Sequence, residues 1–424
     1  MKRRQFIQAL GMGAVLGTVA SRASGASQAR PRVVVVGAGY GGATAARYLS
    51  LWSGGRIDIT LVEPNPAFIS CPLSNLVLGG SRRLEDLTIS YDGLASRNGI
   101  TMVRELATGI DPDKRTVMLG NGKTLRYDRL ILSPGVDFLY DRLPGMRQPG
   151  ARERILHAWK AGEQTVALRR QLEAMEDGQS FLISIPQAPY RCPPGPYERA
   201  CQVAHYFKQA KPKSRVILLD GNEDVVSKGA LFKKVWAERY PGIVDYRPSF
   251  NTVDVDAKSL TVVSELGEEV SGAVINLLPP QAAGSIAAGA GLANANRRWC
   301  EVDFLSFEST QASHIHVLGD AIQVAPLMPK SAHMANQHAK VCAAAIIELL
   351  ADRPPPAHPL LTNTCYSFVS DQDVIHVASV HSYDAQKKTL IAVPGSGGLS
   401  AAPNALEGRY AVDWARNIWA DTLL

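Results

Sequence analysis

The stretch Arg32-Val-Val-Val-Val36-Gly37-Ala-Gly39-Tyr-Gly-Gly42 predicts a strand, a glycine-rich turn and the start of a helix. Four consecutive valines are typical of a strand buried in a parallel sheet. The three glycines of the G-x-G-x-x-G pattern let the backbone approach a pyrophosphate at the N-terminus of the helix expected over residues 43–49. A second strand over residues 57–62 ends in Glu63, an acid placed to bind a ribose hydroxyl. The pattern therefore indicates a dinucleotide-binding βαβ unit.

Two later segments favour FAD over NAD as the dinucleotide. Residues 127–135 resemble the strand and small-residue turn that flavoproteins place beside the adenosine half. Residues 315–321 resemble their late strand, whose terminal acid, here Asp320, meets the ribityl chain. The alternative is that Asp320 only caps the segment that follows it.

A second nucleotide-binding fold is expected after the hydrophobic strand at residues 181–185. Its turn lacks glycines in the phosphate-binding pattern and instead carries prolines and Cys192. Prolines offer no N–H to phosphate oxygens, so we expect this fold to have lost NAD. The alternative is that NAD binds through an unfamiliar turn.

A helix expected over residues 332–350 would aim its positive N-terminus at the flavin pyrimidine, where reduced flavin carries negative charge. Lys330 precedes this helix and either adds charge there or is simply solvated.

The chain has six cysteines, and their spacing excludes common metal and haem motifs. No pair forms C-x-x-C, and C-x-x-C-H is absent, so any c-type haem must be carried by a partner. No metal site is predicted. The cysteines are Cys71, Cys192, Cys201, Cys300, Cys342 and Cys365.

Residues 1–29 are expected to be a twin-arginine export signal, with Arg3 and Arg4 before an apolar stretch and cleavage after Ala26 or Ala29. Export of the folded, cofactor-loaded protein would place it in the bacterial periplasm. The rest of the 424-residue chain is nearly neutral, with no basic run that would indicate nucleic-acid binding and no second segment typical of a membrane span.

Rare strings in the chain resemble the flavoprotein subunit of flavocytochrome c sulfide dehydrogenase, within the disulfide-reductase-like flavoproteins. They include Cys192-Pro-Pro-Gly-Pro-Tyr-Glu-Arg199 and Asn363-Thr-Cys-Tyr-Ser367. The similarity extends along essentially the whole chain after the signal. Together with these strings, the matching segments are residues 33–42, 63–80, 127–135, 191–202, 274–280, 328–331 and 361–366.

The resemblance implies a redox-active disulfide between Cys192 and Cys365 beside the flavin. From the residues alone, Cys192 with Cys201 is the competing pair, although a helix over 200–208 would place Cys201 badly. The resemblance also implies a thioether from Cys71 to the flavin 8α-methyl group, against the alternative of an inert buried thiol. The resemblance further implies that Glu198 accepts a proton near the disulfide. The alternative is that Glu198 only forms an ion pair with Arg191 or Arg199.

The tail is expected to hold a small sheet and a final helix over residues 406–424. Tyr410, Trp414 and Ile418 share one face of that helix, which we interpret as core packing. The resemblance implies that Trp414 also lies near the flavin.

The predicted fold class is α/β: two Rossmann-like nucleotide-binding domains and a small α+β C-terminal domain. The FAD-binding domain (30–145 and 280–355) is interrupted by an inserted domain (146–279), and the C-terminal domain covers 356–424.

The predicted function is oxidation of sulfide to sulfane sulfur, with electrons passed through FAD to a c-type cytochrome subunit. The alternatives are a sulfide:quinone oxidoreductase, an accessory flavoprotein subunit of a sulfur-oxidising complex and, last, an NAD-linked disulfide reductase.

Overall fold

A computed structural model describes residues 29–424, of which Pro31–Leu424 form one compact unit. The export signal predicted for residues 1–29 lies outside the described residues, apart from its last position.

The glycine-rich turn belongs to a five-stranded parallel sheet in the order β19-β9-β1-β2-β5. Helix α1 follows β1 directly and packs against α9, which begins after the last strand of the sheet. Strand β19 comes from far along the chain and pairs with β9, so residues beyond 300 complete the first nucleotide fold. The elements are β1 (Arg32–Val36), α1 (Tyr40–Ser53), β2 (Asp58–Val62), β5 (Thr101–Val103), β9 (Arg129–Leu132), β19 (Ile315–Val317) and α9 (Ala332–Leu349).

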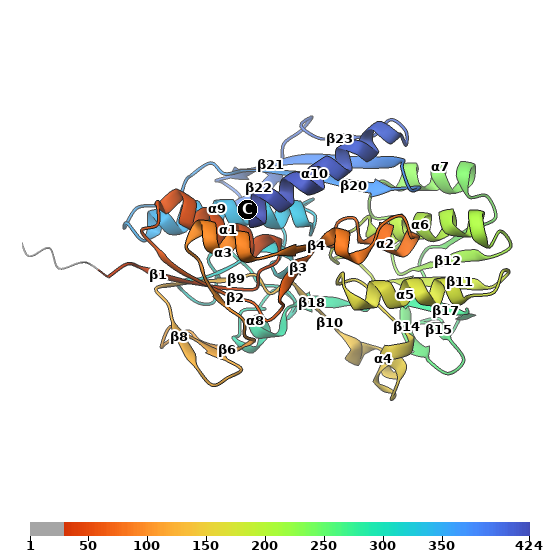
Figure 1. Cartoon of the computed structure of the whole chain (residues 1–424), viewed down its shortest axis with the longest axis horizontal. Coiled ribbons are helices and arrows are strands. Elements are labelled where there is room, and N and C mark those ends of the chain that lie inside the picture. Colours follow the sequence, from red (N-terminus) through yellow and green to blue (C-terminus); the bar gives the residue numbers. More distant parts are fainter. Residues whose placement is uncertain (1–28) are drawn as a thin grey trace, which may run out of the picture. The chain divides into compact units, whose positions relative to one another are not determined.

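A second parallel sheet has the order β13-β12-β11-β17. Figure 1 shows its strands grouped apart from those of the first sheet, with α5 and α6 beside them. Together the two sheets confirm the α/β class with two Rossmann-like folds. The elements are α5 (Glu163–Ala174), β11 (Ser180–Ile185), α6 (Gly195–Ala210), β12 (Arg215–Asp220), α7 (Gly229–Arg239), β13 (Val244–Arg247) and β17 (Val274–Leu277).

An antiparallel sheet follows in the C-terminal part of the chain, where β21 pairs with β20, β22 and β23. The alternation of buried and exposed residues at the start of β20 fits a sheet with one covered face. The strands are β20 (Leu360–Phe368), β21 (Val374–Asp384), β22 (Thr389–Ala392) and β23 (Gly398–Leu399).

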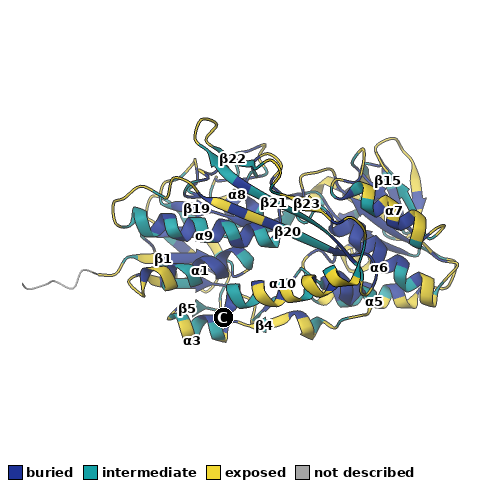
Figure 2. Cartoon of the chain, turned by 90° about the horizontal axis from the view of Figure 1, so that it is seen from above, coloured by how far each residue is buried: buried dark blue, intermediate teal, exposed yellow. Residues whose placement is uncertain are grey.

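Helix α10 (Ala405–Leu423) lies against α1, β20 and β21 and exposes much of its outer face (Figure 2). The buried stripe of α10 contains Gly408, Ala411, Ala415 and Ile418. The small side chains of the first three let the helix pack closely against its neighbours. Ile418 is buried, as predicted, and Trp414 is half-buried, whereas Tyr410 on the same face is 51% exposed, so the prediction that Tyr410 packs in the core is wrong.

The remaining elements connect these sheets. A two-stranded antiparallel pair joins the chain entering the second fold to the chain leaving it, in β10 (Val136–Phe138) and β18 (Gln281–Ala283). The others are β3 (Ala67–Ile69), α2 (Ser74–Gly79), η1 (Leu84–Leu87), β4 (Thr88–Ser90), α3 (Asp92–Asn98), β6 (Ala107–Asp111), β7 (Thr116–Leu119), β8 (Thr124–Arg126), η2 (Tyr140–Arg142), η3 (Pro144–Arg147), α4 (Ala151–Arg154), β14 (Thr252–Asp256), β15 (Thr261–Ser264), β16 (Glu269–Ser271), α8 (Ser285–Gly289) and η4 (Gly319–Ala321).

Candidate active site

The glycine-rich turn has the geometry that a bound pyrophosphate needs. Gly37 has φ 90°, and a side chain there would come within 2.4 Å of the Ser133 carbonyl oxygen. A Cβ at Gly42 would lie 1.8 Å from the Gly37 carbonyl oxygen. Gly39 caps the N-terminus of α1 without a side-chain hydrogen bond, and a Cβ added to it would meet nothing within 4 Å. Open space therefore lies in front of a helix N-terminus, where phosphate oxygens bind.

Two carboxyl groups flank this turn. Glu63, at the end of β2, accepts the Ala38 N–H at 2.8 Å, which fixes its carboxylate beside the glycine-rich turn. Asp320 lies in η4, just after β19, and burial raises the pKa of its carboxyl group. Its Oδ1 atom is buried and has no hydrogen-bond partner within the described part of the chain. Asp320 therefore does not cap the next segment, and an orphaned acceptor there fits a sugar hydroxyl of FAD.

Lys330 is buried, so the alternative that it is simply solvated is wrong. Its Nζ donates to the carbonyl oxygens of Asp320, at 2.9 Å, and Ile322, at 2.5 Å. It also lies 3.6 Å from the centre of the Trp299 ring. Burial lowers the pKa of Lys330 to about 7. The next residue, Ser331, caps α9 by accepting the Met334 N–H at 3.0 Å, so the helix starts where the flavin ring is expected.

Cys71 lies in the loop before α2 and contacts Arg191. The Arg191 guanidinium donates to Cys71 Sγ at 2.8 Å and also to the Trp159 carbonyl oxygen. Trp159 Nε1 donates back to the Arg191 carbonyl oxygen at 3.0 Å. The Cys71 thiol is thus partly exposed and lies against a fixed guanidinium group.

Cys192 begins the turn into α6 in a left-handed backbone conformation, with φ 57°. Its N–H donates to the Lys330 carbonyl oxygen at 2.8 Å, which joins the second fold to the start of α9. A Cβ at Gly195 would lie 3.0 Å from Cys192 Sγ and 2.6 Å from the Trp159 ring. Glycine at position 195 therefore leaves the thiol its space.

Cys365 lies on β20 and shares the electrostatic environment of Cys192, although the two are far apart in the sequence. Asn363 Nδ2 donates to Cys365 Sγ at 3.5 Å. Ser331 Oγ donates to Asn363 Oδ1 at 2.7 Å and so orients this amide. Burial raises the pKa of both cysteine thiols. Both are free thiols in the structure.

Glu198 lies in the first turn of α6, beneath the two thiols. Its Oε1 accepts the Phe368 N–H at 2.9 Å, and its Oε2 accepts Asn75 Nδ2 at 3.0 Å. Burial raises its pKa above the usual value. No ion pair between Glu198 and an arginine occurs among the described residues, so the structure gives no support to the alternative that Glu198 only pairs with Arg191 or Arg199.

The neighbouring Arg199 forms its hydrogen bonds with other residues than Glu198. Its guanidinium donates to four neutral oxygens: His157 O at 3.0 Å, Ala158 O at 2.7 Å, Asn75 Oδ1 at 3.0 Å and Asn276 Oδ1 at 2.9 Å. Burial lowers its pKa to about 10. Since a guanidinium can only donate, it also fixes the orientation of the Asn75 amide.

The remaining cysteines are fully buried, whereas Cys71, Cys192 and Cys365 are partly open. Cys201 accepts a hydrogen bond from Trp236 Nε1 at 3.3 Å inside the second fold, away from any pairing with Cys192. Trp414 lies in ring contact with His333, at 5.7 Å, and Tyr366, at 6.1 Å. It thus borders the start of α9, next to Cys365.

The turn of the second fold has no free ribose-binding acid. Asp220, at the end of β12, accepts hydrogen bonds from Tyr197 Oη at 2.7 Å and Tyr246 Oη at 3.1 Å. Its other oxygen accepts two hydrogen bonds from Asn222. Asp220 is also fully buried, so its carboxyl group is out of reach of a nucleotide ribose.

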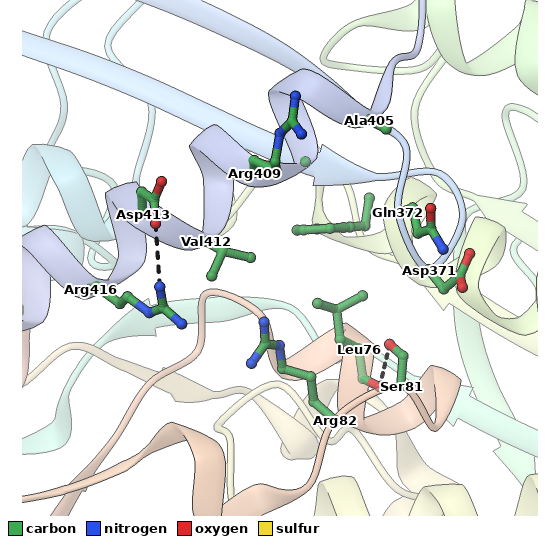
Figure 3. Close-up of a pocket in the computed structure, with 12 residues that line it drawn as sticks. Leu76, Ser81, Arg82, Asp371, Gln372, Ala405, Arg409, Val412, Asp413 and Arg416 are labelled. Carbon is green, nitrogen blue, oxygen red and sulfur yellow. Dashed lines mark hydrogen bonds and ion pairs between the residues drawn. The ribbon is translucent and has the colours of Figure 1, made fainter.

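A pocket of about 580 Å³ lies between α2, α10 and the turn after β20. Leu76 and Val412 face each other across it, while Asp413 pairs with Arg416 at its edge (Figure 3). Phe368 also lines this pocket and donates its N–H to Glu198. The buried Phe368 therefore separates this pocket from the Glu198 carboxyl group.

Sequence reasoning missed three polar residues of this cluster: Arg191 beside Cys71, Asn75 beside Glu198, and Lys228. Lys228 donates to the Cys365 carbonyl oxygen at 3.0 Å from the N-terminus of α7. Arg191 and Asn75 lie within strings that carry the family resemblance, which was the only available signal for them. Nothing in the local sequence marks Lys228.

No helix among the described residues is long and apolar enough to cross a membrane, and no group of acidic, histidine and cysteine side chains there could hold a metal ion.

Comparison with known families gives three matches along the chain. Residues 165–279 match "Sulfide dehydrogenase [flavocytochrome c] flavoprotein chain, central", and residues 357–423 match "Flavocytochrome c sulphide dehydrogenase, flavin-binding". Residues 31–178 match "Pyridine nucleotide-disulphide oxidoreductase". The chain belongs to the flavocytochrome c sulfide dehydrogenase flavoprotein family. It is therefore a flavin-dependent oxidoreductase of the sulfide-oxidising flavoproteins.

Individual relatives agree with this assignment. The sulfide dehydrogenase [flavocytochrome c] flavoprotein chain of Chlorobaculum thiosulfatiphilum is 56% identical over 46 residues, which cover 11% of this chain and 94% of that sequence. The mitochondrial sulfide:quinone oxidoreductase of Dictyostelium discoideum is 23% identical over 68% of this chain and 65% of its own length, so slightly less than two thirds of that protein is spanned. The structure of the sulfide:quinone oxidoreductase from Aquifex aeolicus has the same fold, with a TM-score of 0.74, 19% identity, and coverage of 92% of this chain and 91% of that one.

Proposed function

We propose that this family member oxidises hydrosulfide at a Cys192–Cys365 disulfide and passes the electrons through FAD to a c-type cytochrome subunit. The observation that carries the proposal is the cluster itself. Two thiols from distant parts of the chain share one buried environment with Glu198, and the segments that carry them contact Lys330 and Ser331 at the start of α9.

The residues present fit FAD. The glycine-rich turn would hold the pyrophosphate, Glu63 the ribose and Asp320 the ribityl chain, while the N-terminus of α9 would face the flavin ring. When bound, FAD supplies a two-electron acceptor that can release electrons one at a time. Arg191 holds Cys71 ready for a thioether to the flavin, the covalent link that we include in the proposal.

In the first step hydrosulfide attacks one sulfur of the disulfide. The S–S bond breaks, the attacked cysteine becomes a persulfide, and the second cysteine leaves as a thiolate that carries the electron pair. The proton of the persulfide needs an acceptor. Glu198, whose pKa is raised by burial in the environment of the two thiols, is placed to take that proton. A second hydrosulfide then attacks the outer sulfur of the persulfide, the S–S bond of the persulfide breaks, the cysteine leaves as a thiolate, and the sulfane sulfur departs as a hydrodisulfide.

We further propose that NAD(P)H does not reduce this protein, because Asp220 and the proline-rich turn offer no nucleotide site. The periplasm is the proposed location, from the twin-arginine pattern of residues 1–29.

Anaerobic addition of sulfide to the purified protein tests the proposal. We expect the flavin to bleach and added c-type cytochrome to be reduced without quinone. Reduction only of a quinone analogue would favour a sulfide:quinone oxidoreductase, a candidate that the similarity over 68% and 72% of this chain to two such enzymes supports. Flavin bleaching without turnover on any acceptor would instead indicate an accessory subunit.

A further inference from the structure

Lys228 is a buried cation that reaches from the second nucleotide fold into the C-terminal sheet. It is 6% exposed and precedes α7 in a left-handed backbone conformation, with φ 58°. Within the described part of the chain, all three hydrogen bonds of its ammonium group go to β20 and β21. Nζ donates to Cys365 O at 3.0 Å, to Ser367 Oγ at 2.7 Å and to Ile375 O at 3.3 Å.

These three acceptors are neutral, and Lys228 has no ion-pair partner among the described residues. An ammonium group buried without a counter-charge is costly, and the cost falls when an anion forms nearby. Burial lowers the pKa of Lys228 to about 8, while Cys365, Glu198, Cys192 and Glu407 act in the opposite direction. The influence of Cys365 is the largest of these four, and Lys228 Nζ donates directly to the Cys365 backbone carbonyl oxygen. A thiolate at Cys365 is therefore the anion that would stabilise the buried ammonium most.

The two thiols are not equivalent in this respect. Cys365 Sγ accepts the oriented Asn363 amide, and its own backbone carbonyl holds the Lys228 ammonium. Cys192 Sγ has no hydrogen-bond donor among the described residues. Besides burial, Cys365 and Glu198 raise the pKa of Cys192, and the opposing effects of Arg191 and Lys228 are smaller. The surroundings thus support negative charge at Cys365 better than at Cys192.

We propose that Lys228 is a positioning residue whose ammonium stabilises the Cys365 thiolate when the Cys192–Cys365 disulfide opens. The inference rests on the proposed function and adds which of the two sulfurs hydrosulfide attacks and which one leaves as the thiolate. Hydrosulfide bonds to Cys192 Sγ, the S–S bond breaks, and its electron pair leaves on Cys365 Sγ, because the more stabilised thiolate is the better leaving group. The persulfide forms on Cys192, and Cys365 retains the electron pair for the flavin.

The test compares the two thiols in the reduced holoprotein, by the pH dependence of their alkylation with iodoacetamide and mass spectrometry of the peptides. We expect Cys365 to react with the lower apparent pKa in the unaltered protein. Lys228→Met should raise the apparent pKa of Cys365 by about one unit or more, as loss of a nearby cation does. Lys228→Arg should restore most of that shift. Lys234→Met, which removes an exposed lysine from the same helix, should change nothing.

An unchanged Cys365 profile in a folded Lys228→Met variant would overturn the proposal, and so would a lower apparent pKa for Cys192 than for Cys365 in the unaltered protein. The second comparison holds even if the methionine variant does not fold. Failure of the proposed function would look different. Sulfide would then not open a disulfide in the unaltered protein, whatever the order of the two thiol pKa values.

Discussion

Replacing Glu198 with glutamine exchanges one carboxyl oxygen for an NH₂ group and should lower the free energy of unfolding. Both carboxyl oxygens of Glu198 accept hydrogen bonds, from the Phe368 N–H and from Asn75 Nδ2. The Asn75 amide cannot turn around, because its Oδ1 accepts Arg199 Nε at 3.0 Å. In either orientation the new NH₂ group of glutamine would therefore face a donor. One buried donor left without an acceptor costs about 1–3 kcal/mol of the free energy of unfolding.

The Glu198→Gln substitution should also change how the free energy of unfolding depends on pH. Burial raises the pKa of Glu198 in the folded protein, so the folded state binds more protons than the unfolded state above about pH 4.3. The free energy of unfolding of the unaltered protein then falls as pH rises from there to the folded-state pKa. Glu198→Gln lacks this titration, so its stability deficit should shrink with rising pH. Urea unfolding at several pH values measures it.

The rate of flavin reduction by sulfide gives the functional readout. Stopped-flow measurement should show a loss of about 10²–10⁴-fold in Glu198→Gln, the usual contribution of a general base. Glu238→Gln, on the exposed face of α7, is the matched control and should behave as the unaltered protein. A Glu198→Gln protein with an unaltered rate and pH profile would refute the assignment of proton transfer to this carboxyl group.

Three further outcomes are expected. Acid precipitation of the unaltered protein should leave the yellow colour in the pellet, and Cys71→Ser should release it to the supernatant; colour in the supernatant of both would exclude the thioether. Gly195→Ala places a methyl group 2.6 Å from the Trp159 ring and 3.0 Å from Cys192 Sγ, so urea unfolding should show a loss of about 1–3 kcal/mol, with slower flavin reduction by sulfide; an unaltered rate would show that Cys192 needs no such space. NADH should leave the flavin spectrum unchanged under anaerobic conditions, and bleaching would contradict the loss of the nucleotide site around Asp220.

The elements that could be predicted from the sequence are those with local causes. The valines of β1 and the glycines after it determine a strand and a turn through burial and backbone conformation, and neighbouring residues suffice to recognise them. The same holds for α9, where Ser331 supplies a cap. Tyr410 shows the limit of periodicity, since it shares a helical face with the buried Ile418 and spacing alone does not say how far along the helix that face is covered.

The polar cluster depends on tertiary contacts and was only partly predictable. The proximity of Cys192 and Cys365 was inferred from family resemblance, because their spacing in the sequence carries no information about it. The hydrogen bonds of Lys228 to β20 and β21 join segments that only the complete fold brings together. The same is true of the contact between Arg191 and Cys71.

Peptide mapping of the holoprotein without reducing agent tests the central claim most directly. Before sulfide is added, the peptides that contain Cys192 and Cys365 should be joined by a disulfide. After one equivalent of sulfide under anaerobic conditions they should separate, with one extra sulfur atom on one of them. Two separate, unmodified peptides both before and after sulfide would contradict the account.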